Sequence, residues 1–184
     1  SKGTIIYFEN IKEGIKNTET YLKQLLALYF RFSLIDDKFK IHLNGDPITI
    51  QHLSKLADKT QYLWKINDIK DPYLNEKILP NQNLKQSKTI TSIPSMKGFV
   101  ASVIKPSDIK ILASEEKVTL DLFVNGRLRE KDILKHISAA RIVENYIYGQ
   151  IHFDVLDDDV DRFTSSREGI ISEDPMFQTL LDEV

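Results

Sequence analysis

Two Asn-Gly pairs limit the folds open to this chain more than any other local feature. One pair, at residues 44–45, lies between the short runs 39–43 and 48–50, and the other, at residues 125–126, ends the apolar run 118–124. An Asn-Gly pair between extended runs is the strongest short-range signal for a two-residue β-hairpin turn, because both residues accept positive φ angles. The sequence therefore predicts an antiparallel hairpin in each half of the chain.

Further strands and helices are predicted from hydrophobic spacing. Strands are expected where β-branched and aromatic residues gather, at residues 3–8, 62–66, 98–104 and 146–156. Helices are expected at residues 18–31 with Thr18 as N-cap, at residues 132–143, and after Ser172, with Glu173 and Asp174 in the first turn. Because strands and helices are mixed without regular βαβ alternation, we expect an α+β fold with mixed sheets and helices packed on one face.

A boundary between two lobes is expected near residue 90. Residues 51–90 are less periodic than the rest, carry Pro72 and Pro80, and are rich in Asn, Asp and Lys. We therefore expect a first lobe at residues 1–90 and a second at residues 91–184. The chain opens without Met and ends soon after a predicted helix begins, so it is expected to be a piece of a longer protein.

Composition excludes several classes of protein. With 41% hydrophobic and 28% charged residues, the chain resembles a globular protein rather than a disordered or collagen-like one. No apolar run reaches the roughly 18 residues that cross a bilayer, so no membrane partner is expected. The absence of cysteine excludes disulfides, thiol catalysis and cysteine-ligated zinc, and fits a cytoplasmic location. The net charge of −2 gives no general attraction to nucleic acid, which leaves only a local basic face open.

An acidic run is the first candidate site. Its members are Asp154, Asp157, Asp158, Asp159 and Asp161. The run lacks the alternate spacing and central glycine of a calcium loop, so a solvated loop is expected in preference to a metal site. Arg162, next to this run, is expected to form a structural ion pair.

The four histidines show no pair at metal-binding spacing. His152 alternates with the apolar Ile151 and Phe153, so it is expected to face solvent. Glycine motifs that cradle phosphates or present a nucleophilic serine are absent from the sequence. The chain by itself is therefore not expected to contain a complete active site or a metal ligand set.

Arg167, within the stretch DRFTSSREGI at residues 161–170, is the strongest single candidate. An arginine is always charged and presents a planar set of donors that suits phosphate oxygens. Ser165, Ser166 and Glu168 are expected to hold it in position. The competing interpretation is a structural ion pair with one of the nearby aspartates.

Basic residues in the second half are a weaker candidate for nucleic-acid contact. They are Lys97, Lys105, Lys110, Arg127, Arg129, Lys131 and Lys135. Exposed basic residues are more often a solvated surface, which is the competing interpretation.

Three segments resemble the GHKL ATPase superfamily, which includes gyrase B, the ninety-kilodalton heat-shock chaperones, histidine kinases and MutL. GTIIYF at residues 3–8 is similar to the strand that closes the nucleotide pocket, and LFVNGRLREKDILKHI at residues 122–137 is similar to a hairpin and helix of the MutL transducer domain. YIYGQIHFDVLDDDVDRFTSSREGI at residues 146–170 looks like the chaperone segment that ends in an N-x-S-R-E motif.

This resemblance implies a specific function. Residues 1–90 would hold the end of an ATPase lobe, and residues 91–184 a transducer-type domain with a fold like that of a small-subunit ribosomal protein. Arg167 would reach the γ-phosphate of ATP, and Gly3 and Thr4 would line the nucleotide pocket. ATP and Mg²⁺ would bind the full-length protein, and no cofactor is expected to bind this fragment.

The partners implied are an upstream ATPase lobe and a second copy in a homodimer. The process served would be chaperoning, DNA repair or defence. The alternative is a non-enzymatic module of the same fold that binds protein or nucleic acid.

Overall fold

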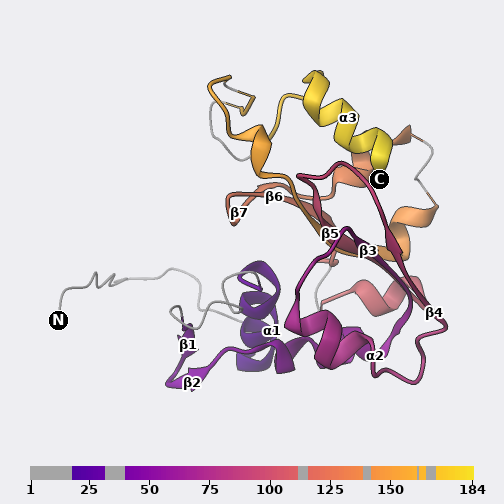
Figure 1. Cartoon of the computed structure of the whole chain (residues 1–184). Helices are drawn as coiled ribbons and strands as arrows, with labels where there is room; N and C mark the ends of the chain where they lie inside the picture. The colour runs from indigo at the N-terminus through magenta and orange to yellow at the C-terminus, as the bar shows by residue number, and fades with distance from the viewer. Residues whose placement is uncertain (1–17, 32–39, 112–115, 139–141, 161, 165–168) are drawn as a thin grey trace, which may run out of the picture.

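A six-stranded mixed sheet lies at the centre of the computed structural model, which describes residues 18–31, 40–111, 116–138, 142–160, 162–164 and 169–184. In spatial order the strands are β4 (Gln86–Ile90), β3 (Thr60–Ile66), β5 (Lys97–Val103), β8 (Ile147–His152), β6 (Leu120–Val124) and β7 (Arg127–Glu130) (Figure 1). β4 is parallel to β3 and β6 is parallel to β8, while the other neighbours are antiparallel.

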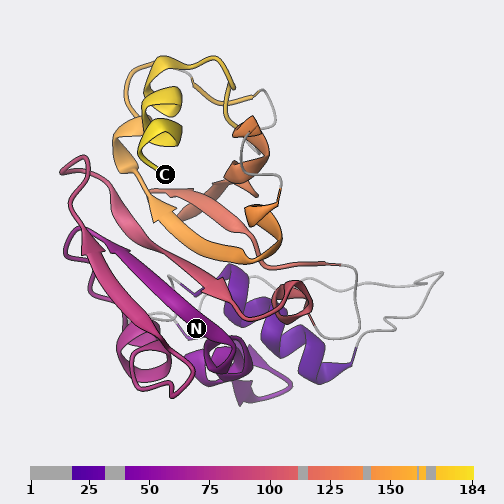
Figure 2. The same cartoon turned by 90° about the vertical axis from the view of Figure 1, so that its right-hand side faces the viewer.

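Helices cover both faces of this sheet, as Figure 2 shows, and not the single face that the sequence predicted. One face carries α1 (Glu19–Tyr29), α2 (Ser54–Asp58) and the short turns η2 (Ile50–Leu53), η3 (Leu74–Ile78) and η4 (Pro106–Ile109). The opposite face carries α3 (Pro175–Glu183), η5 (Ile133–His136) and η8 (Asp154–Leu156), and η7 (Val143–Asn145) precedes β8. A small hairpin of β1 (His42–Leu43) and β2 (Asp46–Pro47) is joined to α1 by the ion pair of Asp46 with Lys23, at 2.6 Å.

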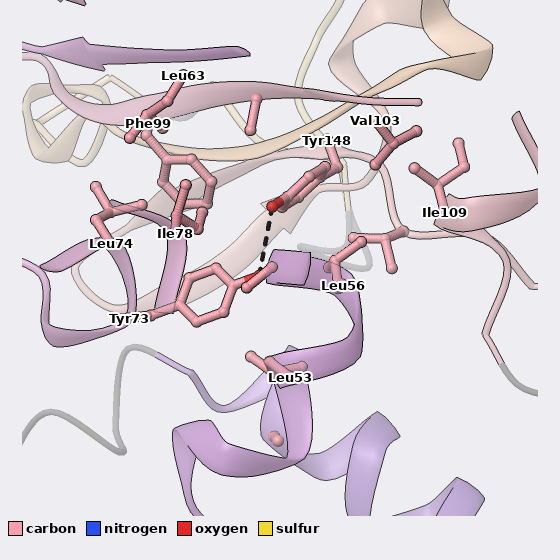
Figure 3. Close-up of a cluster of buried hydrophobic side chains, with 14 of the residues drawn as sticks. Leu53, Leu56, Leu63, Tyr73, Leu74, Ile78, Phe99, Val103, Ile109 and Tyr148 are labelled. Carbon is pink, nitrogen blue, oxygen red and sulfur yellow. Dashed lines mark hydrogen bonds between the residues drawn. The ribbon is translucent and has the colours of Figure 1, made fainter. Parts of the chain in front are cut away.

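The first hydrophobic core lies between the sheet and the α1–α2 side (Figure 3). Leu63, Phe99 and Tyr148 reach into it from three strands, and the rings of Phe99 and Tyr148 meet edge to face at 6.0 Å. The Tyr148 hydroxyl hydrogen-bonds the Thr60 hydroxyl at 2.6 Å and lies 3.4 Å from the Tyr73 hydroxyl. Burial raises the pKa of Tyr148 to about 12, so this polar cluster is uncharged near neutral pH.

The second core lies on the opposite face of the sheet. Leu120, Leu122 and Val124 alternate along β6 and pack with Phe177 and Leu180 of α3. Each of these side chains is fully buried. Because the sheet has a core on both faces, the inner strands β6 and β8 are largely buried on both sides and lack the simple alternation of a surface strand.

The predicted α+β class is confirmed, and several local predictions are confirmed with it. Thr18 caps α1, since its Oγ1 accepts a hydrogen bond from the Tyr21 N–H at 3.2 Å. Both Asn-Gly pairs turn the chain with positive φ angles, 53° and 90° at residues 44–45 and 50° and 72° at residues 125–126. The first hairpin returns through Asp46–Pro47 rather than through residues 48–50.

Other local predictions are wrong. No α-helix forms in the described part of residues 132–143, because Asp132 adopts a left-handed φ of 58° and only the short turn η5 follows. The strand predicted at residues 146–156 ends at His152, where the chain turns into η8. α3 is capped by Asp174 instead of Ser172, since the Asp174 carboxylate accepts the N–H groups of Met176 and Phe177, each at 3.0 Å.

The expected lobe boundary falls in the connection between β4 and β5. β3 and β4 precede it, and β3 pairs with both β4 and β5, so strands from both sides share one sheet. Residues 51–90, expected to be mostly loop, also contain α2, η3 and β4. The predicted strand at residues 3–8 lies outside the described residues. No helix in the described part of the chain is long and apolar enough to cross a bilayer.

Candidate functional site

A surface pocket lies at the edge of the sheet where β3 and β8 end and β5 begins. Its volume is about 570 Å³, and its lining residues are Asp68, Ile69, Lys70, Asp71, Lys97, His152 and Asp154. Lys97 pairs with His152 in the β5–β8 register, and Gly98 pairs with Ile66 of β3. The pocket therefore collects side chains from three strand ends that are far apart in the sequence.

Asn67 fixes the segment that forms one wall of the pocket. It has a left-handed φ of 52°, which asparagine tolerates better than most residues. Its side-chain amide donates to the carbonyls of Ile93 at 2.9 Å and Met96 at 2.6 Å. These bonds attach the chain that leaves β3 to the chain that enters β5, which places Lys70 near Lys97.

A buried ion pair holds Asp71, one of the lining residues of the pocket. The Asp71 carboxylate pairs with the guanidinium of Arg31, which also donates to the side-chain carbonyl of Gln150. The rings of Phe99 and Tyr73 lie 4.8 and 5.5 Å from the guanidinium carbon. Because Arg31 neutralises Asp71, this carboxylate adds no net charge to the pocket.

His152 contributes an uncharged ring. Its imidazole stacks on Phe123 with the ring centroids 5.3 Å apart. Burial, with a further contribution from the positive Arg31, lowers the pKa of His152 to about 4, so the ring is neutral near neutral pH. The prediction that His152 faces solvent is wrong because the neighbouring strand β6 covers it with Phe123.

Four charged side chains remain at the rim of the pocket. Lys70 and Lys97 are exposed, and neither forms an ion pair with any described residue. Asp68 and Asp154 are also exposed, and an Asp154 oxygen accepts the Asn125 N–H at 2.7 Å. The rim thus offers two unpaired ammonium groups and two carboxylates, one of which is already hydrogen-bonded.

The chemistry open to this rim is electrostatic. Ammonium groups on flexible stems bind phosphate oxygens as point charges. Across the described ranges, no group of three or more His, Asp or Glu side chains is placed to hold a metal ion. Among the described residues, the rim therefore offers cationic donors to an anion and no complete set of metal ligands.

The residues that the sequence singled out most strongly are not placed. Gly3, Thr4, Ser165, Ser166, Arg167 and Glu168 lie outside the described residues. The flanks of the Arg167 segment are placed: Phe163 and Ile170 form an isolated antiparallel bridge, and the Thr164 N–H donates to the Gly169 carbonyl at 2.9 Å.

Arg162 has the structural role that the sequence predicts. Its guanidinium bonds Asp174 at 2.6 Å and Asp158 at 2.7 Å, which ties the acidic run to the start of α3. Within the same run, Asp157 accepts from the Asn125 side-chain amide at 2.7 Å. These carboxylates therefore hold turns together, and among the described residues they gather no metal ligand set.

The seven basic residues do not form one uniform surface. Arg129 is buried, with its guanidinium carbon 4.6 Å from the Phe163 ring, and Lys131 donates to the Tyr29 hydroxyl at 2.8 Å. Lys135 pairs with Glu130. Lys97 is the member of the set that lies at the pocket.

A curated protein is similar to this chain over nearly the whole of its length. The chain is 32% identical over 192 aligned residues to "Putative type II restriction enzyme HgiDII" of Herpetosiphon aurantiacus. The alignment covers 99% of this chain but 30% of that relative, so the chain spans less than a third of the relative's length. No family model matches the chain, and no solved structure matches it.

This similarity overturns the assignment to the GHKL ATPase superfamily. The relative is named as a restriction enzyme and not as an ATPase or a chaperone, and no family model supports the earlier interpretation. The GT, VNGR and SRE stretches that carried the resemblance are too short to establish descent. The interpretation as an ATP-sensing transducer is therefore wrong, its non-enzymatic alternative does not fit the relative either, and ATP is not supported as a cofactor.

Most residues of the pocket were missed by the sequence analysis. Lys97 was noted only as one of the basic residues and His152 as a surface residue. Asp68, Lys70 and Asp71 lie in a stretch that was expected to be loop. Three charged residues within four positions, directly after a predicted strand, were the one signal that could have drawn attention to it.

Proposed function

We propose that this chain is a segment of a type II restriction endonuclease, an enzyme that cuts DNA, and that its pocket contacts the DNA backbone. The observation that carries the proposal is the 32% identity to HgiDII across 99% of the chain. Because the chain spans only 30% of that relative, cleavage is proposed for the longer protein and not for this segment alone.

The two ammonium groups of the pocket support contact with phosphate, while Asp68 and Asp154 at the same rim leave it without a net positive charge. Lys70 and Lys97 stand at adjoining strand ends without anionic partners among the described residues, while Arg31 cancels the charge of Asp71. Duplex DNA carries one negative charge per about 1.7 Å of its axis, so two neighbouring ammonium groups can contact phosphates of one backbone. Such contacts position a protein on DNA without reading its sequence.

Mg²⁺ is proposed as the cofactor of the longer protein. Metal ions commonly activate the attacking water and stabilise the leaving oxygen in phosphodiester hydrolysis. Asp68 and Asp154 offer two carboxylates, but the described residues supply no group of three ligands. The metal-dependent step is therefore not assigned to this segment.

The backbone contact is tested by the salt dependence of DNA binding. Each phosphate contact adds about 0.9 to the slope of log K against log salt, so Lys70→Ala with Lys97→Ala should lower that slope by about 2. The loss of affinity should be similar for unrelated duplex sequences, because backbone contacts carry no sequence information.

The same two strands offer a matched control. Lys59 precedes β3 and Lys105 follows β5, so both lie at the strand ends opposite the pocket, and both are exposed. Lys59→Ala with Lys105→Ala changes the net charge equally and should leave the slope unchanged. An equal change of slope in both double variants would show that charge alone, and not the pocket, attracts DNA.

A homodimer and a cytoplasmic location are also proposed. A second copy would allow both strands of a duplex to be cut, and the absence of cysteine suits a reducing compartment. Sedimentation of the longer protein with and without duplex DNA tests the dimer.

A further inference from the structure

An aromatic pair lies on the face of the sheet that carries α3. Tyr62 and Trp64 alternate along β3 with the buried Leu63, and their rings stack with centroids 6.0 Å apart and planes 23° from parallel. Both rings are half-buried, so part of each remains open to solvent. Neither ring belongs to the two buried cores.

Two lysines border this pair on the edge of the sheet. The Lys85 ammonium lies 5.9 Å from the centroid of the Tyr62 ring. Lys88 of β4 is paired with Trp64 in the parallel β3–β4 register, so both side chains project on the same face. Both lysines are exposed, and no described carboxylate forms an ion pair with either.

Trp64 also forms one wall of a hollow between the sheet and the end of α3. The hollow has a volume of about 240 Å³, and its other apolar walls come from Ile66, Ile90, Val100, Ile147 and Val184. Its polar side chains are Ser92 and Glu183, and the Ser92 hydroxyl donates to a Glu183 oxygen at 2.6 Å. Ile90 is 43% exposed, which leaves the hollow accessible.

We propose that this hollow, with the Tyr62–Trp64 pair, binds an unpaired nucleobase of a DNA strand. The volume is below the roughly 300 Å³ at which pockets for drug-sized ligands begin, which suits one planar ring. Aromatic side chains stack on every base, and lysines beside them bind the adjoining phosphates. The Glu183 carboxylate can accept a hydrogen bond from an exocyclic amino group, so adenine and cytosine are preferred over thymine.

A nucleobase fits these features better than a protein partner does. All five residues of β4 are exposed and four of them are polar, so the rim beside the aromatic pair is not an apolar docking surface. The bordering cations complement a phosphate backbone. This inference rests on the DNA contact proposed above. It adds a second contact, with a nucleobase, on the face of the sheet that carries α3.

Trp64 is the one tryptophan of the chain, so its fluorescence reports directly on the proposed site. Titration of this chain with single-stranded dA, dC and dT oligonucleotides should quench the fluorescence, at lower concentration for dA and dC than for dT. Tyr62→Leu should weaken binding about 10-fold, and Lys88→Glu should weaken it further at low salt. Glu183→Gln should reduce the preference for dA and dC without abolishing quenching.

The outcomes separate this inference from the proposed function. Quenching that is absent at saturating oligonucleotide, or unchanged in Tyr62→Leu and Lys88→Glu, overturns the base site, whatever the duplex affinity of the Lys70 and Lys97 pocket. Quenching of Trp64 in this chain, together with a longer protein that cuts no DNA, leaves the base site standing and removes the restriction function. A blue shift of Trp64 that grows with protein concentration in the absence of DNA would show that a second copy covers the hollow, and would also overturn the proposal.

Discussion

The ion pair of Arg31 and Asp71 should be one of the most sensitive points of the fold. Their side chains are 3% and 2% exposed, so water cannot replace either partner. In Asp71→Asn the new amide can still accept the Tyr73 N–H that the Asp71 carboxylate accepts at 2.9 Å. The Arg31 charge, however, would stay buried without an anion, and removal of one partner from a buried pair costs about 3–5 kcal/mol.

A double substitution distinguishes the effect of the buried charges from the effect of the packing around them. In Arg31→Met with Asp71→Asn both charges are absent, and the methionine can pack between the Tyr73 and Phe99 rings that now flank the guanidinium. Replacement of both partners of a buried pair is often nearly neutral, so the double variant should recover most of the loss. Each single substitution should cost about 3–5 kcal/mol and the double variant much less than their sum, so the coupling energy should exceed the roughly 3 kcal/mol at the upper end of values for residues in contact.

Urea unfolding followed by circular dichroism measures these free energies. In a chain of this length 1 kcal/mol corresponds to about 2–4 °C, so Asp71→Asn should also lower the melting temperature by roughly 6–20 °C. The reasoning is refuted if Asp71→Asn stays within about 1 kcal/mol of the parent chain, or if the losses of the two single variants simply add.

Three further predictions concern packing, pH and helix capping. Gly149→Ala should destabilise the sheet by about 1–3 kcal/mol or more, because an added Cβ would lie 2.1 Å from the Phe99 carbonyl oxygen. Ser102→Ala on the adjoining strand is the control, and equal urea unfolding midpoints for the two variants would contradict the clash. Stability should fall by roughly 3 kcal/mol as pH drops from 6.5 towards about 4, because the unfolded chain protonates His152 before the folded chain does. This loss should disappear in His152→Gln when urea midpoints are compared across pH. Parallel plots of urea midpoint against pH for the parent chain and the variant would count against it. Asp174→Ala should lower the free energy of unfolding by about 1 kcal/mol more than Asp174→Asn does, because asparagine retains the N-cap of α3 while both variants lose the ion pair with Arg162. Equal melting temperatures of the two variants would place the effect in the ion pair alone.

The elements that were predicted well are those specified by neighbouring residues. Thr18 caps α1 through a donor three positions away, and each Asn-Gly pair supplies both positive φ angles of its own turn. These signals need no tertiary contact, so they can be read from the sequence. The strands β5 and β6 were also found, because apolar residues predominate in both of them.

The elements that were missed depend on partners far away in the chain. Every residue of β4 is in part exposed and most are polar, and β4 is a strand because it pairs in parallel with β3. The apolar stripe at residues 132–143 suggested a helix, but Asp132 turns the chain and buries Ile133 through a short turn instead. The helical spacing of apolar residues therefore indicated burial correctly at Ile133 and Leu134, but it was wrong about the secondary structure and about Ile142, which is 79% exposed.

The pocket could not have been predicted from sequence for the same reason. Asp71 is neutralised by Arg31, which stands 40 positions earlier, and the Arg31 guanidinium is fixed by Gln150, 119 positions later. The neutral state of His152 likewise depends on Phe123 of another strand. Short motifs carried the family resemblance instead, and the longer alignment to a restriction enzyme replaced it.

Cleavage of DNA by the longer protein that contains this chain tests the central claim most directly. Supercoiled plasmid incubated with that protein and Mg²⁺ should be cut on both strands at one recurring sequence, with the ends mapped by sequencing, and a chelator should stop the reaction. Lys70→Ala with Lys97→Ala should slow cutting at moderate salt more than Lys59→Ala with Lys105→Ala does. Plasmid that stays intact under all these conditions, or breaks that fall at no preferred sequence, would contradict the assignment to a type II restriction endonuclease.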